Sequence, residues 1–208
     1  FEYITKKASF YSRDFYVEEG VLIPRPETEI LVDCAAQIIK KLNAKYIAEI
    51  GTGSGVISIM IALLFEDVEI VATDISNEAI LLARKNAIKF GVENRVEFVH
   101  TSYLDGVVLP EVLVSNPPYI AKSEALEEHV LNEPHTALFG GLRGDEILRD
   151  IIDIYNKNSE ILALACEMGY DQKSSLEEYF KELHVKNYSF YKDLGGFDRG
   201  FKILRSLV

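Results

Sequence analysis

Cysteine is scarce in this chain, and the two cysteines present do not suggest a cross-link or a metal site. Cys34 lies in a helical pattern, Cys166 lies in a strand pattern, and neither has a neighbour at metal-ligand spacing. We expect both to be reduced thiols in the core, which suits a cytoplasmic protein.

Long hydrophobic runs are also missing. No stretch approaches the ~20 apolar residues that a membrane-spanning helix needs, and no basic-then-apolar leader opens the chain. The sequence therefore predicts a soluble protein without a membrane partner. Because residue 1 is Phe1 rather than Met, we expect the natural protein to be longer at this end.

Basic residues are few relative to acidic ones. The chain has 22 lysines and arginines and 33 aspartates and glutamates, which gives a formal net charge of −11. Such a surface repels phosphate backbones and offers no footprint for non-specific duplex binding. We therefore expect no direct nucleic-acid partner.

The chain does have enough apolar residues for one sizeable core. Its 208 residues are 48% hydrophobic, which suits a single α/β domain. Strand-like and helix-like patterns alternate, and the first helix is expected to begin at Pro26, with an apolar stripe at Ile30, Leu31, Cys34, Ile38 and Leu42. The expected strands are 46–50, 69–73, 95–100, 111–115 and 161–166, with 186–192 and 200–204 as an antiparallel edge pair, and further helices are expected at 56–65 and 77–90.

A glycine-rich turn joins the first of these strands to a helix. It runs from Glu49 through Gly51, Thr52, Gly53 and Ser54 to Gly55. Glycines there permit a tight turn and close approach of a ligand, as in nucleotide-binding loops, although the same pattern also makes a plain strand-to-helix connection. The glycines at every second position differ from the dinucleotide fingerprint and from the phosphate loop, so neither nicotinamide nor ATP is favoured.

An acidic residue ends the next strand. Asp74 follows Gly51 by 23 positions, a spacing at which a carboxylate can accept both ribose hydroxyls. The alternative is a helix cap for 77–90, a role for which Ser76 competes. Combined with the glycine turn, the ribose interpretation favours an adenosine cofactor without a phosphate clamp, which fits S-adenosylmethionine.

The tetrapeptide Asn116-Pro117-Pro118-Tyr119 follows the fourth strand and indicates the chemistry. Two prolines stiffen the loop and remove two N–H donors. The Asn116 side-chain oxygen and the Pro117 carbonyl can accept the two hydrogens of a planar amide and orient its nitrogen toward a methyl donor, with Tyr119 stacked on the flat group. Neither a metal nor a strong general base is required. The alternative is a simple Asn-Pro turn that ends a strand.

Several motifs together resemble the release-factor glutamine methyltransferases, the HemK/PrmC family, over essentially the whole chain. The most specific is Ile23-Pro24-Arg25-Pro26-Glu27-Thr28-Glu29. The others are the glycine turn, Asn116 to Tyr119, Glu133-Pro134 with Ala137-Leu138, and Asp193-Leu194-Gly195-Gly196-Phe197-Asp198-Arg199.

The resemblance implies a Rossmann-like, seven-stranded class I methyltransferase sheet over 23–208, mostly parallel with the antiparallel edge pair. It implies that 1–22 is a β-type linker or hairpin following a small helical domain that is missing here. We separately expect a monomer. It further implies methyl transfer from S-adenosylmethionine to the side-chain nitrogen (N5) of the glutamine in the Gly-Gly-Gln motif of peptide chain release factors, the protein partner.

The resemblance also implies roles for single residues. Gly51 to Gly55 would line the methionine part of the cofactor, Asp74 its ribose and Tyr103 the adenine. Glu49, Ile75 and Ser102 would also bind the cofactor. Asn116 to Tyr119 would hold the substrate glutamine, with Asn116, Pro117 and Tyr119 as catalytic residues and Asn116 also against the cofactor. Arg25 and Thr28 would close over the cofactor, while a surface salt link is an alternative for Arg25.

Two departures from the family pattern stand out. Ser102 replaces an acidic residue that is common after the third strand, which puts the adenine contact there in doubt, and the Asp-Gly order after Gly140-Gly141 appears as Gly144-Asp145. We assign no role to His129 and His135.

Two other functions fit parts of the pattern. An enzyme methylating an exocyclic nucleic-acid amine (N6 of adenine or N2 of guanine) suits the same tetrapeptide, but it must flip its base and grip phosphates, which the acidic balance disfavours. A non-catalytic cofactor-binding module would be favoured by a damaged substrate loop, and here the loop is intact.

Overall fold

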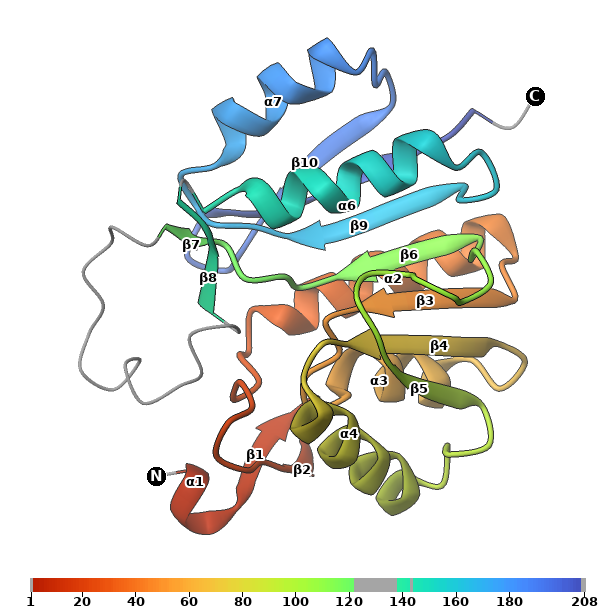
Figure 1. Ribbon diagram of the computed structural model, residues 1–208, viewed down its shortest axis with the longest axis vertical. Helices are drawn as coiled ribbons and strands as arrows, with labels where there is room; N and C mark the ends of the chain where they lie inside the picture. The colour runs from red at the N-terminus through yellow and green to blue at the C-terminus, as the bar shows by residue number, and fades with distance from the viewer. Residues whose placement is uncertain (1, 122–137, 143, 207–208) are drawn as a thin grey trace.

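The computed structural model describes residues 2–121, 138–142 and 144–206. Its centre is a seven-stranded sheet with the order β10-β11-β9-β6-β3-β4-β5 (Figure 1). The strands are β3 (Tyr46–Ile50), β4 (Glu69–Asp74), β5 (Val96–His100), β6 (Val112–Ser115), β9 (Ala163–Glu167), β10 (Tyr188–Lys192) and β11 (Asp198–Leu204).

The strand directions confirm the predicted sheet. The pairs β3–β4, β3–β6, β4–β5 and β6–β9 are parallel. Strand β11 runs antiparallel to both β9 and β10, which makes the expected antiparallel edge pair.

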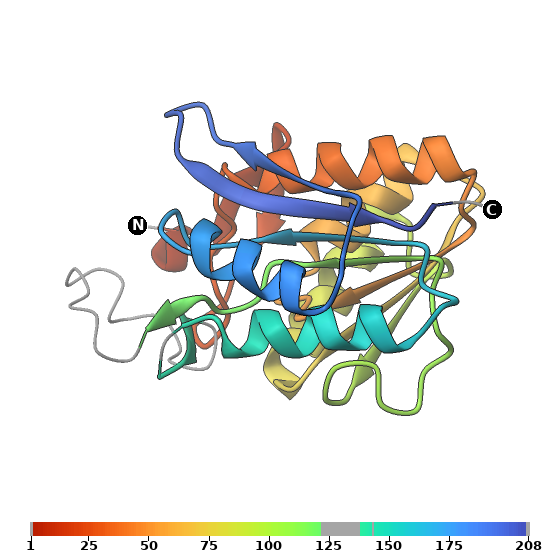
Figure 2. The ribbon, with the colours of Figure 1, turned by 90° about the horizontal axis from the view of Figure 1, so that it is seen from above.

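Helices cover both faces of the sheet, and Figure 2 shows α2 on one side with α6 and α7 on the other. The first face carries α2 (Thr28–Leu42), α3 (Val56–Leu64) and α4 (Asn77–Phe90), and the second carries α6 (Glu146–Lys157) and α7 (Lys173–Glu182). Because side chains alternate along a strand, β6 sends Val112 and Val114 into the first apolar core and Leu113 into the second. Such burial on both faces explains the continuous apolar runs in the parallel strands.

Helix α2 begins at Thr28 and not at Pro26. The backbone N–H groups of Thr28 and Glu29 bond to the carbonyls of Arg25 and Pro26, three residues back, so 25–27 form a tighter turn before the α-helix. The buried face of the helix is also broader than the predicted stripe, because it includes Val32, Ala35 and Ile39 while Ile30 and Leu42 are only partly buried.

A β-hairpin precedes α2. Strands β1 (Lys7–Phe10) and β2 (Arg13–Tyr16) pair antiparallel after the short helix α1 (Glu2–Thr5). Phe10 and Phe15 lie in the first apolar core with their ring centroids 6.1 Å apart. Residues 7–16 thus form a hairpin packed on the first core, while the domain boundary at residue 23 and an upstream helical domain stay predictions.

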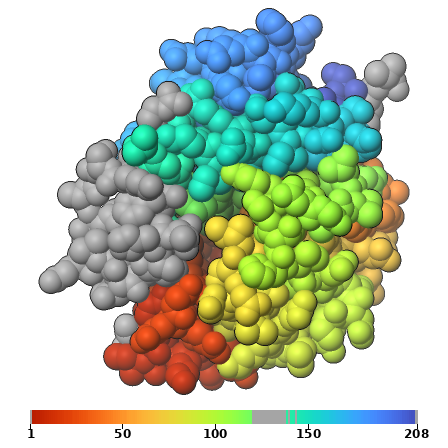
Figure 3. Space-filling model, viewed as in Figure 1, coloured from red at the N-terminus to blue at the C-terminus, as the bar shows by residue number. Residues whose placement is uncertain are grey.

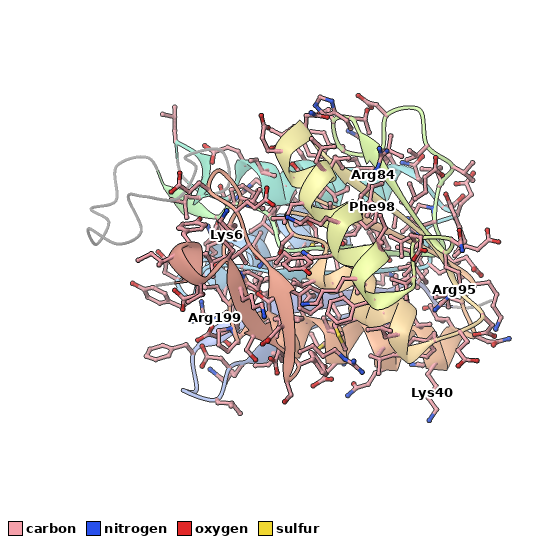
Figure 4. The ribbon with its side chains drawn as sticks, turned by 90° about the horizontal axis from the view of Figure 1, so that it is seen from below. Lys6, Lys40, Arg84, Arg95, Phe98 and Arg199 are labelled. Atoms are coloured by element: carbon pink, nitrogen blue, oxygen red, sulfur yellow. The ribbon has the colours of Figure 1, made fainter. Side chains whose placement is uncertain are left out.

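Helix α4 connects the hairpin, the sheet edge and the glycine turn. At the sheet edge, Arg84 donates to the Phe98 carbonyl of β5 at 2.8 Å, and Figure 4 shows the two residues side by side. The amide of Asn86, fully buried, accepts from the Tyr16 N–H and donates to the Tyr16 and Ser54 carbonyls at 2.8, 3.0 and 2.9 Å.

Two minor strands flank the part of the chain that is not described. Strand β7 (Ile120–Ala121) pairs with β8 (Phe139–Gly141). Within the described ranges, no helix is long and apolar enough to cross a membrane.

The two-sided core predicts how stability depends on the central strands. Replacing Leu113, which is fully buried, by alanine should lower the free energy of unfolding by about 2–5 kcal/mol, because it leaves a cavity between β6 and the second helical layer. Urea unfolding measures the change. The matched control is Leu81→Ala, since Leu81 is 57% exposed on α4; equal losses in the two variants would contradict the assigned packing.

Candidate functional site

A cavity of about 220 Å³ opens where β3, β4 and β6 end. In the space-filling view the surface is hollowed where the red N-terminal segment meets the yellow segment (Figure 3). The strand order reverses beside β3, since the chain continues to β4 on one side and returns to β6 on the other. Ligands of open α/β sheets bind at such reversals, at the carboxyl ends of the strands.

Most of the residues predicted for the site line this cavity. They are Arg25, Thr28, Glu49, Gly51, Thr52, Gly53, Ser54, Asp74, Ile75, Ser102, Tyr103, Asn116, Pro117 and Pro118. Gly55 and Tyr119 are the two predicted site residues that do not line it. The sequence motifs thus converge on one cavity, and the roles of the single residues stay predictions.

The glycine turn is fixed by backbone hydrogen bonds. The N–H groups of Gly51 and Thr52 donate to the Thr73 carbonyl at 2.9 and 3.0 Å. Gly55 has φ of 85°, and a Cβ there would lie 3.0 Å from the Ala83 side chain. Glycine is needed at this position because both the backbone conformation and the approach of α4 disfavour a side chain.

Asp74 closes the turn from the neighbouring strand. Its two carboxylate oxygens accept from the N–H groups of Gly53 and Ser76, each at 2.9 Å. The hydroxyl of Ser76, and not Asp74, caps α4 by accepting from the Ala79 N–H at 3.2 Å. Burial raises the pKa of the Asp74 carboxyl, while the two backbone N–H groups lower it.

Glu49 is a buried carboxyl in the cavity wall, only 1% exposed. Its Oε2 accepts from the Thr52 hydroxyl at 2.9 Å and from both the N–H and the hydroxyl of Ser58. Its Oε1 has no hydrogen-bond partner among the described residues. Burial raises the pKa of Glu49 to about 8. An unpartnered buried acceptor at a cavity wall fits a cationic donor such as an ammonium group.

Asn116 stands at the end of β6 and is held from α2. Its amide nitrogen donates to the Thr28 hydroxyl at 3.1 Å, and that hydroxyl donates to Oε2 of Glu167 at 2.8 Å. The amide oxygen of Asn116 is therefore turned away from Thr28. Asn116 lines the cavity, and its role as an acceptor for the substrate amide stays a prediction.

Glu167 ends β9 and is 1% exposed. Its second oxygen accepts from the Tyr119 hydroxyl at 3.1 Å, and the Tyr119 carbonyl accepts from the Gln172 amide at 2.8 Å. Burial raises the pKa of Glu167 to about 7, against the lowering effect of the Thr28 and Tyr119 hydroxyls and of Arg199. The stacking predicted for Tyr119 stays a prediction, and the hydrogen bonds of this residue instead hold the loop.

Tyr103 lines the far side of the cavity in a left-handed conformation, with φ of 49°. Its hydroxyl donates to Asp150 of α6 at 2.6 Å, and its carbonyl accepts from the Thr73 hydroxyl at 2.6 Å. Tyr103 is thus held beside Ser102 through both its hydroxyl and its backbone carbonyl. The proposed adenine contact remains a prediction for this pair.

Sequence reasoning missed several contributors, among them Glu167, Ser58 and the segment 20–22. Glu167 and Ser58 support the site from behind, and 20–22 forms part of the wall. An acidic residue closing an apolar strand at the ligand edge of the sheet is the signal that could have found Glu167. His129, His135, Glu133-Pro134 and Ala137 lie outside the described residues.

The buried carboxyls predict a pH dependence of stability. The pKa of Glu49 rises from its ordinary 4.5 to about 8 on folding, so between these values the unfolded chain loses the proton that the folded protein keeps. The free energy of unfolding should therefore fall as pH rises from about 5 to about 8. Urea unfolding across this range tests it. Glu49→Gln should have a shallower slope, and an unchanged slope would contradict the assignment.

Comparison with known proteins agrees with the geometry. The model of the "Methyltransferase small domain" family matches residues 27–141. Two solved structures share the fold: the N-terminal domain of human METTL16 in complex with SAH (TM-score 0.67, 15% identity, 91% of this chain and 74% of that one), and the ribosomal protein L11 methylase from Lactobacillus delbrueckii subsp. bulgaricus (TM-score 0.64, 22% identity, 92% and 84%).

Relatives with higher identity carry a more specific name. The release factor glutamine methyltransferase of Dictyoglomus turgidum is 39% identical over 97% of this chain and 74% of that protein. The protein of the same name from Clostridium botulinum is 34% identical, with the same coverage of each chain. The chain therefore belongs to the release factor glutamine methyltransferase family of methyltransferases.

Proposed function

We propose that this protein transfers a methyl group from S-adenosylmethionine to the side-chain amide nitrogen of the glutamine in the Gly-Gly-Gln motif of peptide chain release factors. The observation that carries the proposal is the orientation of Asn116. Its amide nitrogen is bound to Thr28, so its oxygen can accept a hydrogen from a second amide. The family membership supports the same substrate.

The cavity residues fit the cofactor. Oε1 of Glu49 has no partner among the described residues and suits the ammonium of the methionine part, and Asp74 suits the ribose hydroxyls. Ile75 and Tyr103 would contact the base, and Arg25 and Thr28 would close the wall. When bound, S-adenosylmethionine supplies an electrophilic methyl group on a good leaving group. The METTL16 structure with SAH supports a ligand of this kind in the same fold.

Asn116 and Pro117 would orient the substrate. The Asn116 Oδ1 and the Pro117 carbonyl accept the two N–H hydrogens of the glutamine, which fixes the plane of its amide and raises the electron density on nitrogen. Pro118 keeps the loop stiff, because its ring fixes φ. The protein thus supplies two hydrogen-bond acceptors. They orient the amide nitrogen, a weak nucleophile, for in-line attack on the methyl group.

The protein environment fits the same proposal. Cys34 and Cys166 are free and buried, in keeping with the reducing cytoplasm, where release factors act during translation. We infer a monomer that works on a protein substrate. Nucleic-acid amine methylation is the second candidate, and the net charge of −11 disfavours it.

The substrate assignment is tested by labelled methyl transfer. We expect transfer to a release factor, none to the same factor with its Gly-Gly-Gln glutamine changed to alanine, and none to DNA or RNA. Asn116→Ala should lower kcat by about 10²–10³-fold, since it removes one preorganised acceptor, while affinity for S-adenosylhomocysteine is retained. Transfer to nucleic acid alone would reverse the order of the two candidates.

The cofactor assignment is tested by calorimetry with S-adenosylhomocysteine. Asp74→Ala should weaken binding by about 1–3 kcal/mol, the usual scale for hydrogen bonds to a charged group. The control is Asp171→Ala, because Asp171 is exposed and does not line the cavity. Unchanged affinity in the Asp74 variant would remove this residue from the site.

A further inference from the structure

A series of side-chain hydrogen bonds leads from the cavity wall to Glu167 at the carboxyl end of β9. It runs from the Asn116 amide to the Thr28 hydroxyl, at 3.1 Å, and from that hydroxyl to the Glu167 carboxyl, at 2.8 Å. Thr28 and Glu167 are 2% and 1% exposed, so solvent does not compete for these bonds. Asn116 follows β6, Thr28 opens α2 and Glu167 ends β9, so the three residues are far apart in the sequence.

The chemistry of the three groups fixes which one donates and which one accepts in each of these hydrogen bonds. An ionised carboxylate only accepts, so Glu167 takes the single hydroxyl hydrogen of Thr28. The Thr28 oxygen must then accept from its other neighbour, and only the NH2 end of the Asn116 amide can donate. The amide oxygen of Asn116 is consequently directed away from the Thr28 hydroxyl, and Asn116 itself lines the cavity.

Glu167 is itself held in place. Its other oxygen accepts from the Tyr119 hydroxyl at 3.1 Å, and Arg199 lies close enough to favour the ionised form. Arg199 is fixed in turn by two hydrogen bonds to Asp193, at 3.1 and 2.8 Å, and Figure 4 labels its position. The motif at 193–199, which the proposed function leaves without a role, thus supports the carboxyl at the end of the chain.

We propose that Glu167 is a positioning residue that sets the orientation of the Asn116 amide through the Thr28 hydroxyl. The inference rests on the proposed function, because an oriented acceptor matters only for a substrate that donates N–H hydrogens. Glu167 does not line the cavity, so its effect on the substrate passes through the side chains that it binds, Thr28 and Tyr119, and the Thr28 variants isolate the path to Asn116.

The substitution Glu167→Gln keeps the shape of the side chain but reverses the donor-to-acceptor direction of these hydrogen bonds. A glutamine NH2 can donate to Thr28, which frees the hydroxyl hydrogen to point at Asn116. The Asn116 amide then turns its oxygen toward Thr28 and its NH2 toward the cavity, where it opposes the NH2 of the substrate glutamine. Thr28→Val removes the hydroxyl altogether, whereas Thr28→Ser keeps it.

The test measures methyl transfer to a release factor at alkaline pH, where Glu167 is ionised. Glu167→Gln and Thr28→Val should each lower kcat by about tenfold to a hundredfold, the scale of a misplaced reacting group. Thr28→Ser should restore most of the rate, and affinity for S-adenosylhomocysteine should change little in Glu167→Gln, because Glu167 does not line the cavity. The double variant Glu167→Gln with Thr28→Val should lose no more than the worse single variant, because both act through one chain.

A second measurement keeps this inference separate from the proposed substrate. The side-chain NH2 signals of Asn116, followed by ¹⁵N NMR, should shift in Glu167→Gln and Thr28→Val and remain near the wild type in Thr28→Ser and in the exposed control Thr5→Val. Wild-type protein that fails to methylate a release factor would refute the proposed function alone. Unmoved Asn116 signals, or rate losses that multiply in the double variant, would overturn the positioning role.

Discussion

The reversal of strand order beside β3 is the constraint on which the site depends. Because β4 and β6 flank β3 in parallel, the residues that end these strands meet at one edge: Glu49 in β3, Asp74 in β4 and Asn116 after β6. The two helical layers leave this edge open while they bury both faces of the sheet. A rigid core thus positions polar groups that come from distant parts of the chain.

The same edge concentrates carboxyl groups where desolvation is costly. Glu49, Asp74 and Glu167 all have pKa values raised by burial, and each is compensated by donors from the backbone or from hydroxyl groups. A cation bound beside these carboxyls would favour their ionised forms, which fits the sulfonium and ammonium of the proposed cofactor.

Local patterns in the sequence predicted the sheet and most of the cavity wall, because strand periodicity and short motifs are local properties. The first turn before Thr28 differed from prediction, since Pro26 fits a tight turn as well as a first helical turn. Glu167 was missed because its role depends on α2 and the loop after β6, which touch β9 only in the folded chain. Motif spacing cannot report a hydrogen bond across 139 residues.

Asn86 binds the end of the N-terminal hairpin and the glycine turn with one amide. The hairpin is therefore part of the framework that holds the turn, even though it contributes no motif. Cutting the chain at residue 23 would strip Asn86 of its Tyr16 partners and remove Phe10 and Phe15 from the core. The smallest fragment able to keep the ligand pocket in shape consequently has to start ahead of β1.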